Sequence, residues 1–170
     1  GFMALKESAF TAYAAHPVQD FHIPPADKGK IAQIVFGGFS RCLYPVQKFQ
    51  SDTERKLAII LDRYAEKWFK PALGQFQIYY TSGIEQLEYQ PDFIAEVANF
   101  IYMMEPKASR EVDTPVVQAK RDAAVTWCQR ATNHSKEYGG KPWRYVLIPH
   151  EAISENMTLE GLVAQYSQII

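Results

Sequence analysis

The strongest constraint on the fold is a pair of apolar stretches joined by the tight turn 97–100. An antiparallel hairpin centred on this turn places Val97 opposite Phe100, and the same register places Asp92 opposite Glu105. Directly opposed residues share a face of the sheet, with Cβ atoms about 4.5–5.5 Å apart. Because both arms are apolar almost throughout, the pattern is typical of strands buried on both faces.

The ends of this hairpin carry charge. The period of two along a strand puts Lys107 on the same face as Glu105, so two carboxylates and one ammonium group converge. Such a set also occurs on solvated strand faces, and that structural alternative stays open. However, charges at the end of a buried hairpin are costly unless they are paired or bind a metal. The setting therefore favours a divalent-metal site formed by Asp92, Glu105 and Lys107.

Composition sets broad limits. A chain of 170 residues with 47% hydrophobic residues reads as one globular domain with a genuine core. The net charge of −1 does not exclude nucleic acid, because a local basic patch suffices for binding. Cys42 and Cys128 stand far apart and are typical of reduced thiols, which favours a cytoplasmic location. No stretch is long and apolar enough for a membrane span, and no phosphate-binding loop is present, so any nucleotide-driven motor would lie outside this chain.

The order of expected elements indicates the fold class. A capping-box sequence at Ser51 predicts a helix to about Lys70, and a second helix is expected from Asp113 to about Ser135. Strands are expected at 76–80, in the two arms of the hairpin and at 143–148, and a last helix at 158–168. The order helix, three strands, helix, strand predicts an α/β fold with a mixed β-sheet flanked by helices. The buried stripe of the first helix is expected to be Leu57, Leu61, Tyr64 and Trp68, and that of the second Val117, Ala124, Trp127, Cys128 and Ala131.

Three regions follow from this order. Residues 1–50 read as a leading arm with a β-hairpin, formed by 31–36 and 41–44, that packs on the core or on an upstream motor. Residues 51–150 form the core with the charged site, and residues 151–170 supply the C-terminal helix.

Phosphodiester hydrolysis is the chemistry that such a site suits. It needs a water molecule made nucleophilic at neutral pH and a cation beside the phosphate, and Mg²⁺ held by one or two carboxylates supplies both. Asp92 and Glu105 are the expected ligands, and the main-chain carbonyl of Pro106 is a third. Lys107 is expected either to orient or deprotonate the water or to stabilise the pentavalent phosphate.

Other polar residues have two interpretations each. The Glu54 carboxylate either reaches back to the Ser51 N–H as a helix cap or points towards the acidic patch. Gln118 and Lys120 at the start of the second helix either contact a phosphate or form its solvated face. Arg110 is a further candidate for the DNA backbone.

These motifs resemble the PD-(D/E)xK nucleases, and more narrowly the C-terminal endonuclease domain of the helicase (Res) subunit of type III restriction enzymes. The resemblance spans about residues 50–150. The residues that carry it are Ser51-Asp52-Thr53-Glu54-Arg55, Tyr89-Gln90-Pro91-Asp92-Phe93, Glu105-Pro106-Lys107, the Lys120, Ala123, Ala124 and Trp127 helix pattern, and Trp143-Arg144-Tyr145.

The resemblance implies a restriction-endonuclease-like core and Mg²⁺-dependent cleavage of double-stranded DNA, with Mn²⁺ as a possible substitute. It also implies an upstream helicase motor in the same full-length chain, which alone would use ATP, and a methyltransferase (Mod) subunit as partner. Acids on the first helix often join the metal site in such proteins, which favours the functional reading of Glu54. Pro106 departs from the usual pattern, because proline cannot donate to a sheet ladder, so the strand is expected to end, bulge or lie unpaired there. The alternative, from another class, is a catalytically silent DNA-binding or docking domain.

Overall fold

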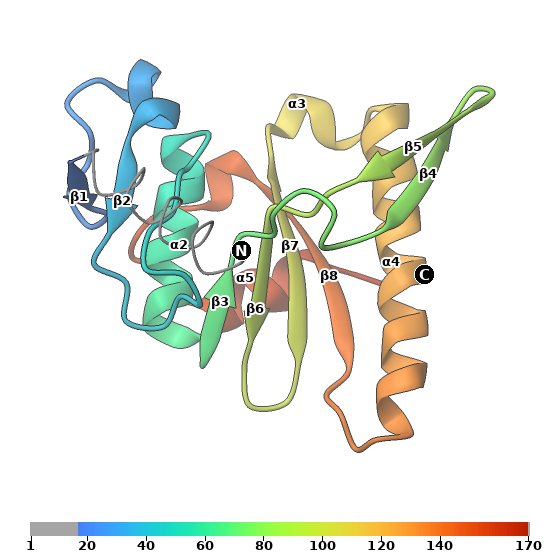
Figure 1. Ribbon diagram of the computed structural model, residues 1–170. Coiled ribbons are helices and arrows are strands. Elements are labelled where there is room, and N and C mark those ends of the chain that lie inside the picture. Colours follow the sequence, from blue (N-terminus) through green and yellow to red (C-terminus); the bar gives the residue numbers. More distant parts are fainter. Residues whose placement is uncertain (1–16, 170) are drawn as a thin grey trace, which may run out of the picture.

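A computed structural model describes residues 17–169 and shows a five-stranded mixed sheet with helices on both faces (Figure 1). This confirms the expected α/β class. The strands lie in the order β3-β6-β7-β8-β9, in which only β7 and β8 are parallel. Their bounds are β3 Lys67–Phe69, β6 Phe93–Glu96, β7 Ile101–Lys107, β8 Trp143–Pro149 and β9 Ser167–Gln168.

Each face of the sheet has its own apolar core, because successive side chains of a strand point to opposite faces. Helices α2 (Asp52–Tyr64) and α5 (Leu159–Tyr166) cover one face, where Phe93 and Met104 are buried. Helix α4 (Pro115–Lys136) covers the other face, where Met103 is buried. Helices α4 and α5 and strand β8 match their expected positions within two residues.

The expected hairpin register is confirmed. Phe93 pairs with Met104 and Glu96 with Ile101, and the Val97 N–H donates to the Phe100 carbonyl at 2.9 Å. The turn lacks glycine, and a residue from outside the hairpin stabilises it. The Lys141 ammonium group contacts the Val97 carbonyl at 2.8 Å and the Glu96 carboxylate at 2.7 Å.

Pro106 neither ends strand β7 nor makes it bulge, contrary to part of the expectation. Strand β7 runs through Pro106 to Lys107 without a break in its pairing with β8. Along β7, the main-chain N–H and C=O groups of successive residues point alternately towards β6 and towards β8. The Phe100 carbonyl faces the β6 side, because it accepts the bond from Val97, so the main-chain groups of Pro106, six residues later, face that side as well. Since β6 begins only at Phe93, the missing N–H of Pro106 has no strand to face. The expectation that Pro106 is unpaired is therefore correct on the β6 side alone.

Helix α2 ends six residues earlier than expected. Its last residue is Tyr64, whose side chain is exposed, and Trp68 lies fully buried in edge strand β3 instead of on the helix stripe. The Asp62 carboxylate explains the change of direction, because it accepts hydrogen bonds from the Trp68 indole N–H at 2.9 Å and from the Arg41 main-chain N–H at 2.8 Å. Because Arg41 is distant in sequence, its contact with Asp62 cannot be read from the helical periodicity, and that periodicity extends beyond the residue at which the helix ends.

The strand expected at 76–80 is displaced and has a different partner. It forms β4 (Ile78–Ser82), which pairs with β5 (Glu85–Tyr89) in a separate two-stranded sheet, and β5 was not expected. Gly83 has φ of +62° in the two-residue loop, where glycine is favoured because it lacks Cβ. Of the three strands expected between the two long helices, the first in chain order is therefore β3, followed by β6 and β7.

The leading arm does not contain the expected β-hairpin. Of the residues expected in that hairpin, 31–33 belong to the 3₁₀ helix η1 (Lys28–Gln33), and the first arm is represented by the short strand β2 (Val35–Gly37). It pairs in parallel with β1 (Val18–Asp20), and Cys42 makes only an isolated bridge with Trp68. The part of the expected arm before residue 17 lies outside the described residues.

Candidate functional site

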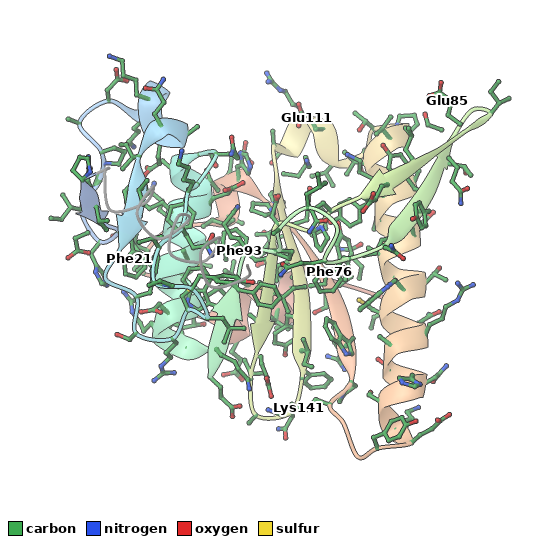
Figure 2. The ribbon with its side chains drawn as sticks, viewed as in Figure 1. Phe21, Phe76, Glu85, Phe93, Glu111 and Lys141 are labelled. Atoms are coloured by element: carbon green, nitrogen blue, oxygen red, sulfur yellow. The ribbon has the colours of Figure 1, made fainter. Side chains whose placement is uncertain are left out.

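A cavity of about 470 Å³ opens where β7 ends. Asp92, Glu105, Pro106 and Lys107 all line it, so the structure brings together the residues that the hairpin register placed on one face. Glu111, on the short helix α3 (Ser109–Val112), also lines it, and Figure 2 shows Glu111 and Lys141 at opposite ends of the sheet. The remaining lining residues are Gln50, Ser51, Glu54, Glu88, Tyr89, Gln90, Ala108, Lys120 and His150.

Glu105 is the most constrained carboxylate of the site, with only 5% of its surface exposed. Its Oε1 lies 3.1 Å from the Lys107 ammonium nitrogen, and its Oε2 accepts a hydrogen bond of 2.8 Å from the Tyr89 hydroxyl. The Tyr145 hydroxyl lies 3.4 Å from that of Tyr89. A buried carboxylate requires such partners, because an unpaired one would lose its hydration without compensation.

Asp92 is half-buried and has no cation bonded directly to it within residues 17–169. Burial, together with the negative charges of Glu105 and then Glu54, raises the pKa of the Asp92 carboxyl to about 8. The more distant ammonium groups of Lys70 and Lys107 oppose this shift without cancelling it. Asp92 thus holds a proton at neutral pH that a cation entering the cavity would displace.

Lys107 stays charged in this setting. Burial works to lower the pKa of its ammonium group, but the carboxylates of Glu105, Asp92 and Glu111 outweigh burial, so the pKa is raised. A lysine whose pKa is raised does not give up its proton at neutral pH. Of the roles expected for Lys107, this favours a fixed positive charge over a general base.

Glu54 combines parts of both expected roles. The Ser51 hydroxyl caps the helix by accepting from the Glu54 N–H at 3.2 Å, and the Glu54 carboxylate reaches back one residue further than expected, to the Gln50 N–H at 2.9 Å. The same oxygen of Glu54 contacts the Lys70 ammonium group at 2.6 Å. The carboxylate nevertheless lines the cavity and raises the pKa of Asp92.

One side chain in the cavity wall buries polar atoms that lack a partner, and one main-chain carbonyl points away from the paired part of the sheet. The Gln90 side chain buries both its amide nitrogen and its amide oxygen without a hydrogen bond among the described residues. The alternation of main-chain groups along β7 directs the Pro106 carbonyl towards the side where β6 has ended. Buried polar groups in proteins are nearly always satisfied, so the Gln90 amide is an exception among the side chains of the cavity wall.

The three expected DNA contacts lie in different settings. Lys120 lines the cavity, and its ammonium nitrogen lies 5.5 Å from the centre of the Tyr80 ring. Gln118 donates instead to the Val112 carbonyl at 2.7 Å, which satisfies the end of α3, and does not line the cavity. Arg110 is exposed on α3 at the rim, outside the set of lining residues.

The sequence did not single out Tyr89, Lys70, Gln90 and His150 as site residues. Tyr89 and Gln90 precede Asp92 by three and two positions and were quoted only as part of a motif. Lys70 is brought in by the early end of α2, and His150 by the 3₁₀ helix η2 (His150–Ala152) that follows β8. No spacing rule would have found Lys70 and His150, because His150 lines the cavity from η2, whereas Lys70, just after β3, contacts the Glu54 carboxylate.

Among residues 17–169, no group of three or more His, Cys, Asp or Glu side chains is close enough together to hold a metal ion. Lys70 and the Gln50 N–H hold the Glu54 carboxylate, which leaves Asp92 and Glu105 as the two acids of the expected pair. Within the same range, no helix is long and apolar enough to span a membrane.

Comparisons with protein families, with curated proteins and with solved structures found no match.

Proposed function

We propose that this chain is a Mg²⁺-dependent endonuclease domain that hydrolyses phosphodiester bonds in double-stranded DNA. The observation that carries the proposal is the convergence of Asp92, Glu105 and Lys107 on one cavity at the end of β7. Two carboxylates beside a fixed ammonium group suit a site that binds a divalent cation and a phosphate together. Supporting this, burial and the negative charges of Glu105 and Glu54 raise the pKa of Asp92 by more than Lys70 and Lys107 lower it, as is common at functional sites.

The topology supports the narrower assignment to a restriction-endonuclease-like core. Strands β3, β6 and β7 form an antiparallel meander, β8 joins β7 in parallel, and α2 and α4 lie on opposite faces (Figure 1). This is the helix, three strands, helix, strand order that the PD-(D/E)xK resemblance implies. The β4–β5 sheet then counts as an insertion between the first and second core strands.

The residues present fit a Mg²⁺ ion. Such an ion takes oxygen ligands and keeps several waters, so it needs only the Asp92 and Glu105 carboxylates and the Pro106 carbonyl from the protein. When bound, the cation would supply a water of lowered pKa and positive charge beside the phosphate.

The chain itself supplies three further contributions. Tyr89 fixes the orientation of the Glu105 carboxylate through a hydrogen bond of 2.8 Å. Lys107 offers a permanent positive charge beside Glu105, placed to stabilise charge that builds up on the phosphate. Lys120, which also lines the cavity, is placed to contact a neighbouring phosphate of the same strand.

The proposal includes a context outside this chain. An upstream ATP-driven helicase would deliver DNA to the site, and a methyltransferase subunit would recognise the sequence. Residues 18–50 pack beside α2 and offer a surface for such a motor, with Leu43 and Tyr44 exposed.

The second candidate is a catalytically silent DNA-binding or docking domain. The observation that favours it is the pairing of acids with lysines, Glu105 with Lys107 and Glu54 with Lys70, which neutralises two of the five carboxylates that line the cavity. In a silent domain, these pairs would be permanent. In a nuclease, Mg²⁺ would displace Lys107 from one oxygen of Glu105.

A plasmid-nicking assay with Mg²⁺ or Mn²⁺ tests the proposal. We expect nicking by the wild-type chain, and loss of at least about 100-fold in Asp92→Asn and in Lys107→Met, because each removes a group that acts on the reacting phosphate. The matched control is Asp113→Asn, which changes an exposed carboxyl outside the cavity and should nick as the wild type does. Nicking that survives both site substitutions would remove this site from consideration.

Calorimetric titration with Mg²⁺ separates the two candidates where the isolated chain does not nick. A nuclease should bind Mg²⁺ with release of a proton near pH 7, because the cation displaces the proton of Asp92, and Asp92→Asn should abolish that release. Absence of both nicking and Mg²⁺ binding would favour the silent domain.

A further inference from the structure

Strand β4 leaves one edge unpaired, because it pairs with β5 alone among the described residues. Ser82 and Glu85 close the two-residue loop as a hydrogen-bonded pair, so the main-chain groups of Tyr79 and Thr81 point away from β5. No hydrogen bond outside the ladder uses the N–H or C=O of these two residues within the described part of the chain. The result is a row of free donors and acceptors along an extended strand.

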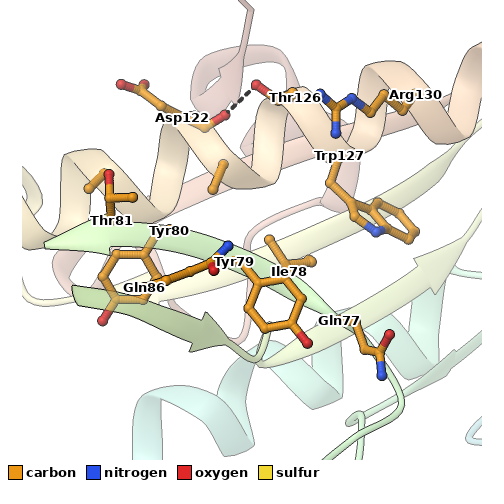
Figure 3. Close-up of a pocket in the computed structure, with 12 residues that line it drawn as sticks. Gln77, Ile78, Tyr79, Tyr80, Thr81, Gln86, Asp122, Thr126, Trp127 and Arg130 are labelled. Atoms are coloured by element: carbon orange, nitrogen blue, oxygen red, sulfur yellow. Dashed lines mark hydrogen bonds between the residues drawn. The ribbon is translucent and has the colours of Figure 1, made fainter. Parts of the chain in front are cut away.

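This edge borders a groove of about 610 Å³ whose other side is helix α4. Figure 3 shows the groove, with Trp127 and Arg130 on the helix and Tyr79 on the strand side. Small side chains, Ala119 and Ala123, line the helix wall and allow a main chain to come close. A strand edge running beside a helix is an arrangement that accepts an added strand.

The two edges of this hairpin differ in their protection. Natural proteins usually block a free edge with charged side chains or proline, because an open edge pairs with other chains. Strand β5 carries Glu85 and Glu88, whereas the residues of β4 (Ile78–Ser82) include neither a charge nor a proline. Tyr79, in the middle of the open edge, keeps 50% of its surface exposed. The sequence of β4 is therefore suited to pairing.

We propose that the β4 edge pairs with the β4 edge of a second copy of this chain, antiparallel and about a two-fold axis. With Tyr79 opposite Thr81 of the second copy, and the reverse, each pair can exchange both of its N–H···O bonds. Because β4 is uncharged, self-pairing brings no like charges together. The contact is the same patch on both copies, as a two-fold interface requires.

Self-pairing also extends the hairpin, because the dimer joins β5, β4 and their copies into one four-stranded sheet. Nucleic acid is a poorer occupant, because Glu85 on the hairpin would repel phosphates. The Asp122 carboxylate in the groove would not oppose the dimer, since the Arg121 guanidinium group neutralises it at 2.6 Å.

The test is sedimentation velocity of the 170-residue chain over a range of concentrations, without DNA or metal. We expect a dimer fraction that grows with concentration in the wild type. Thr81→Lys should weaken the dimer by about tenfold or more, because it puts a charge on the open edge. The matched control is Ile84→Lys, which adds the same charge at the fully exposed loop tip of the same hairpin, outside the residues that line the groove, and should change the dimer by less than about twofold.

Hydrogen exchange locates the contact. The amides of Tyr79 and Thr81 should become protected as the wild-type dimer forms, and should stay unprotected in Thr81→Lys, with the melting temperature checking that each variant folds. A chain that stays monomeric at every concentration, or a dimer that forms without protection of these amides, would overturn the proposal. Since neither readout involves DNA or Mg²⁺, the result is independent of the proposed nuclease activity.

Discussion

The Tyr89 hydroxyl donates a hydrogen bond of 2.8 Å to Oε2 of Glu105, and both groups are buried. The bond links β5, which belongs to the small two-stranded sheet, to β7 in the centre of the main sheet. Burial, followed by the negative charge of Glu105, raises the pKa of Tyr89 well above its ordinary value, so this hydroxyl remains a donor throughout the working pH range.

Removing that donor should weaken both stability and activity. We expect Tyr89→Phe to lower the free energy of unfolding by about 1.5–3 kcal/mol, the range for a hydrogen bond to a charged group. Nicking should fall as well, because the Glu105 carboxylate loses its fixed orientation. Chemical denaturation and the nicking assay measure the two effects. Tyr145→Phe is the comparison, since the Tyr145 hydroxyl lies 3.4 Å from that of Tyr89 and does not reach Glu105 directly; an equal loss in both variants would contradict this assignment.

The Asp92 carboxyl should make stability depend on pH in an unusual direction. Its pKa is about 8 in the folded chain and ordinarily 3.8, so the folded state keeps a proton that the unfolded state has lost. The stability contributed by this proton is fully present below about pH 4 and is lost as pH rises towards 8. We therefore expect metal-free Asp92→Asn to be more stable than the wild type at pH 7.5, on the order of 1–3 kcal/mol, because asparagine carries no charge. Denaturation at pH 4 and pH 7.5 should show a gap between the two proteins only at the higher pH, and Asp113→Asn should show none.

Lys107 should act through its charge. Because its pKa is raised, we expect Lys107→Arg to keep a measurable fraction of the nicking rate and Lys107→Met to lose it. If Lys107 worked instead as a general base, arginine would fail as completely as methionine, since a guanidinium group does not deprotonate in proteins. The nicking rates of the three proteins, measured from pH 6.5 to 9, distinguish the two roles.

Pro106 should be replaceable without harm. We expect Pro106→Ala to change the free energy of unfolding by less than about 1 kcal/mol and to leave nicking within about twofold, because the N–H that alanine restores faces a place where β6 has ended. Met104→Pro is the contrast. Met104 pairs with Phe93, so proline there removes a ladder hydrogen bond and should cost about 3 kcal/mol or more. A large loss of stability in Pro106→Ala would show that the ladder continues further than the register indicates.

Lys120 and Gln118 should differ in DNA binding, although both begin α4. Lys120→Ala should weaken the binding of a duplex in the absence of metal and reduce the slope of affinity against salt by about one, as expected for one lost phosphate contact. Gln118→Ala should leave the salt slope unchanged, because its amide is used by the Val112 carbonyl. Fluorescence anisotropy at several salt concentrations measures both, and equal slopes for the two variants would contradict a phosphate contact by Lys120.

Local rules were sufficient for part of this protein. The alternation and turn of the central hairpin determined its register, and the structure places Asp92 and Glu105, just beyond the last paired residues, in one cavity with Lys107. The helix start at Ser51 was also readable, because its cap is formed by neighbouring residues, and the start at Pro115 was readable because proline is favoured in the first turn of a helix. Such features depend on groups within a few positions in the chain or directly across one turn.

Tertiary structure alone decided the rest. Helix α2 stops at Tyr64 because residues 40, 41 and 68 converge on Asp62, and this early stop is what brings Lys70 to Glu54. The parallel partner of β7, the reach of Tyr89 to Glu105 and the position of His150 each depend on segments that are distant in sequence. Sequence periodicity reports which residues are buried together within one element. Sequence periodicity does not report which separate elements pack against those residues. The packing of separate elements placed the charged groups around Asp92 and left one edge of β4 unpaired.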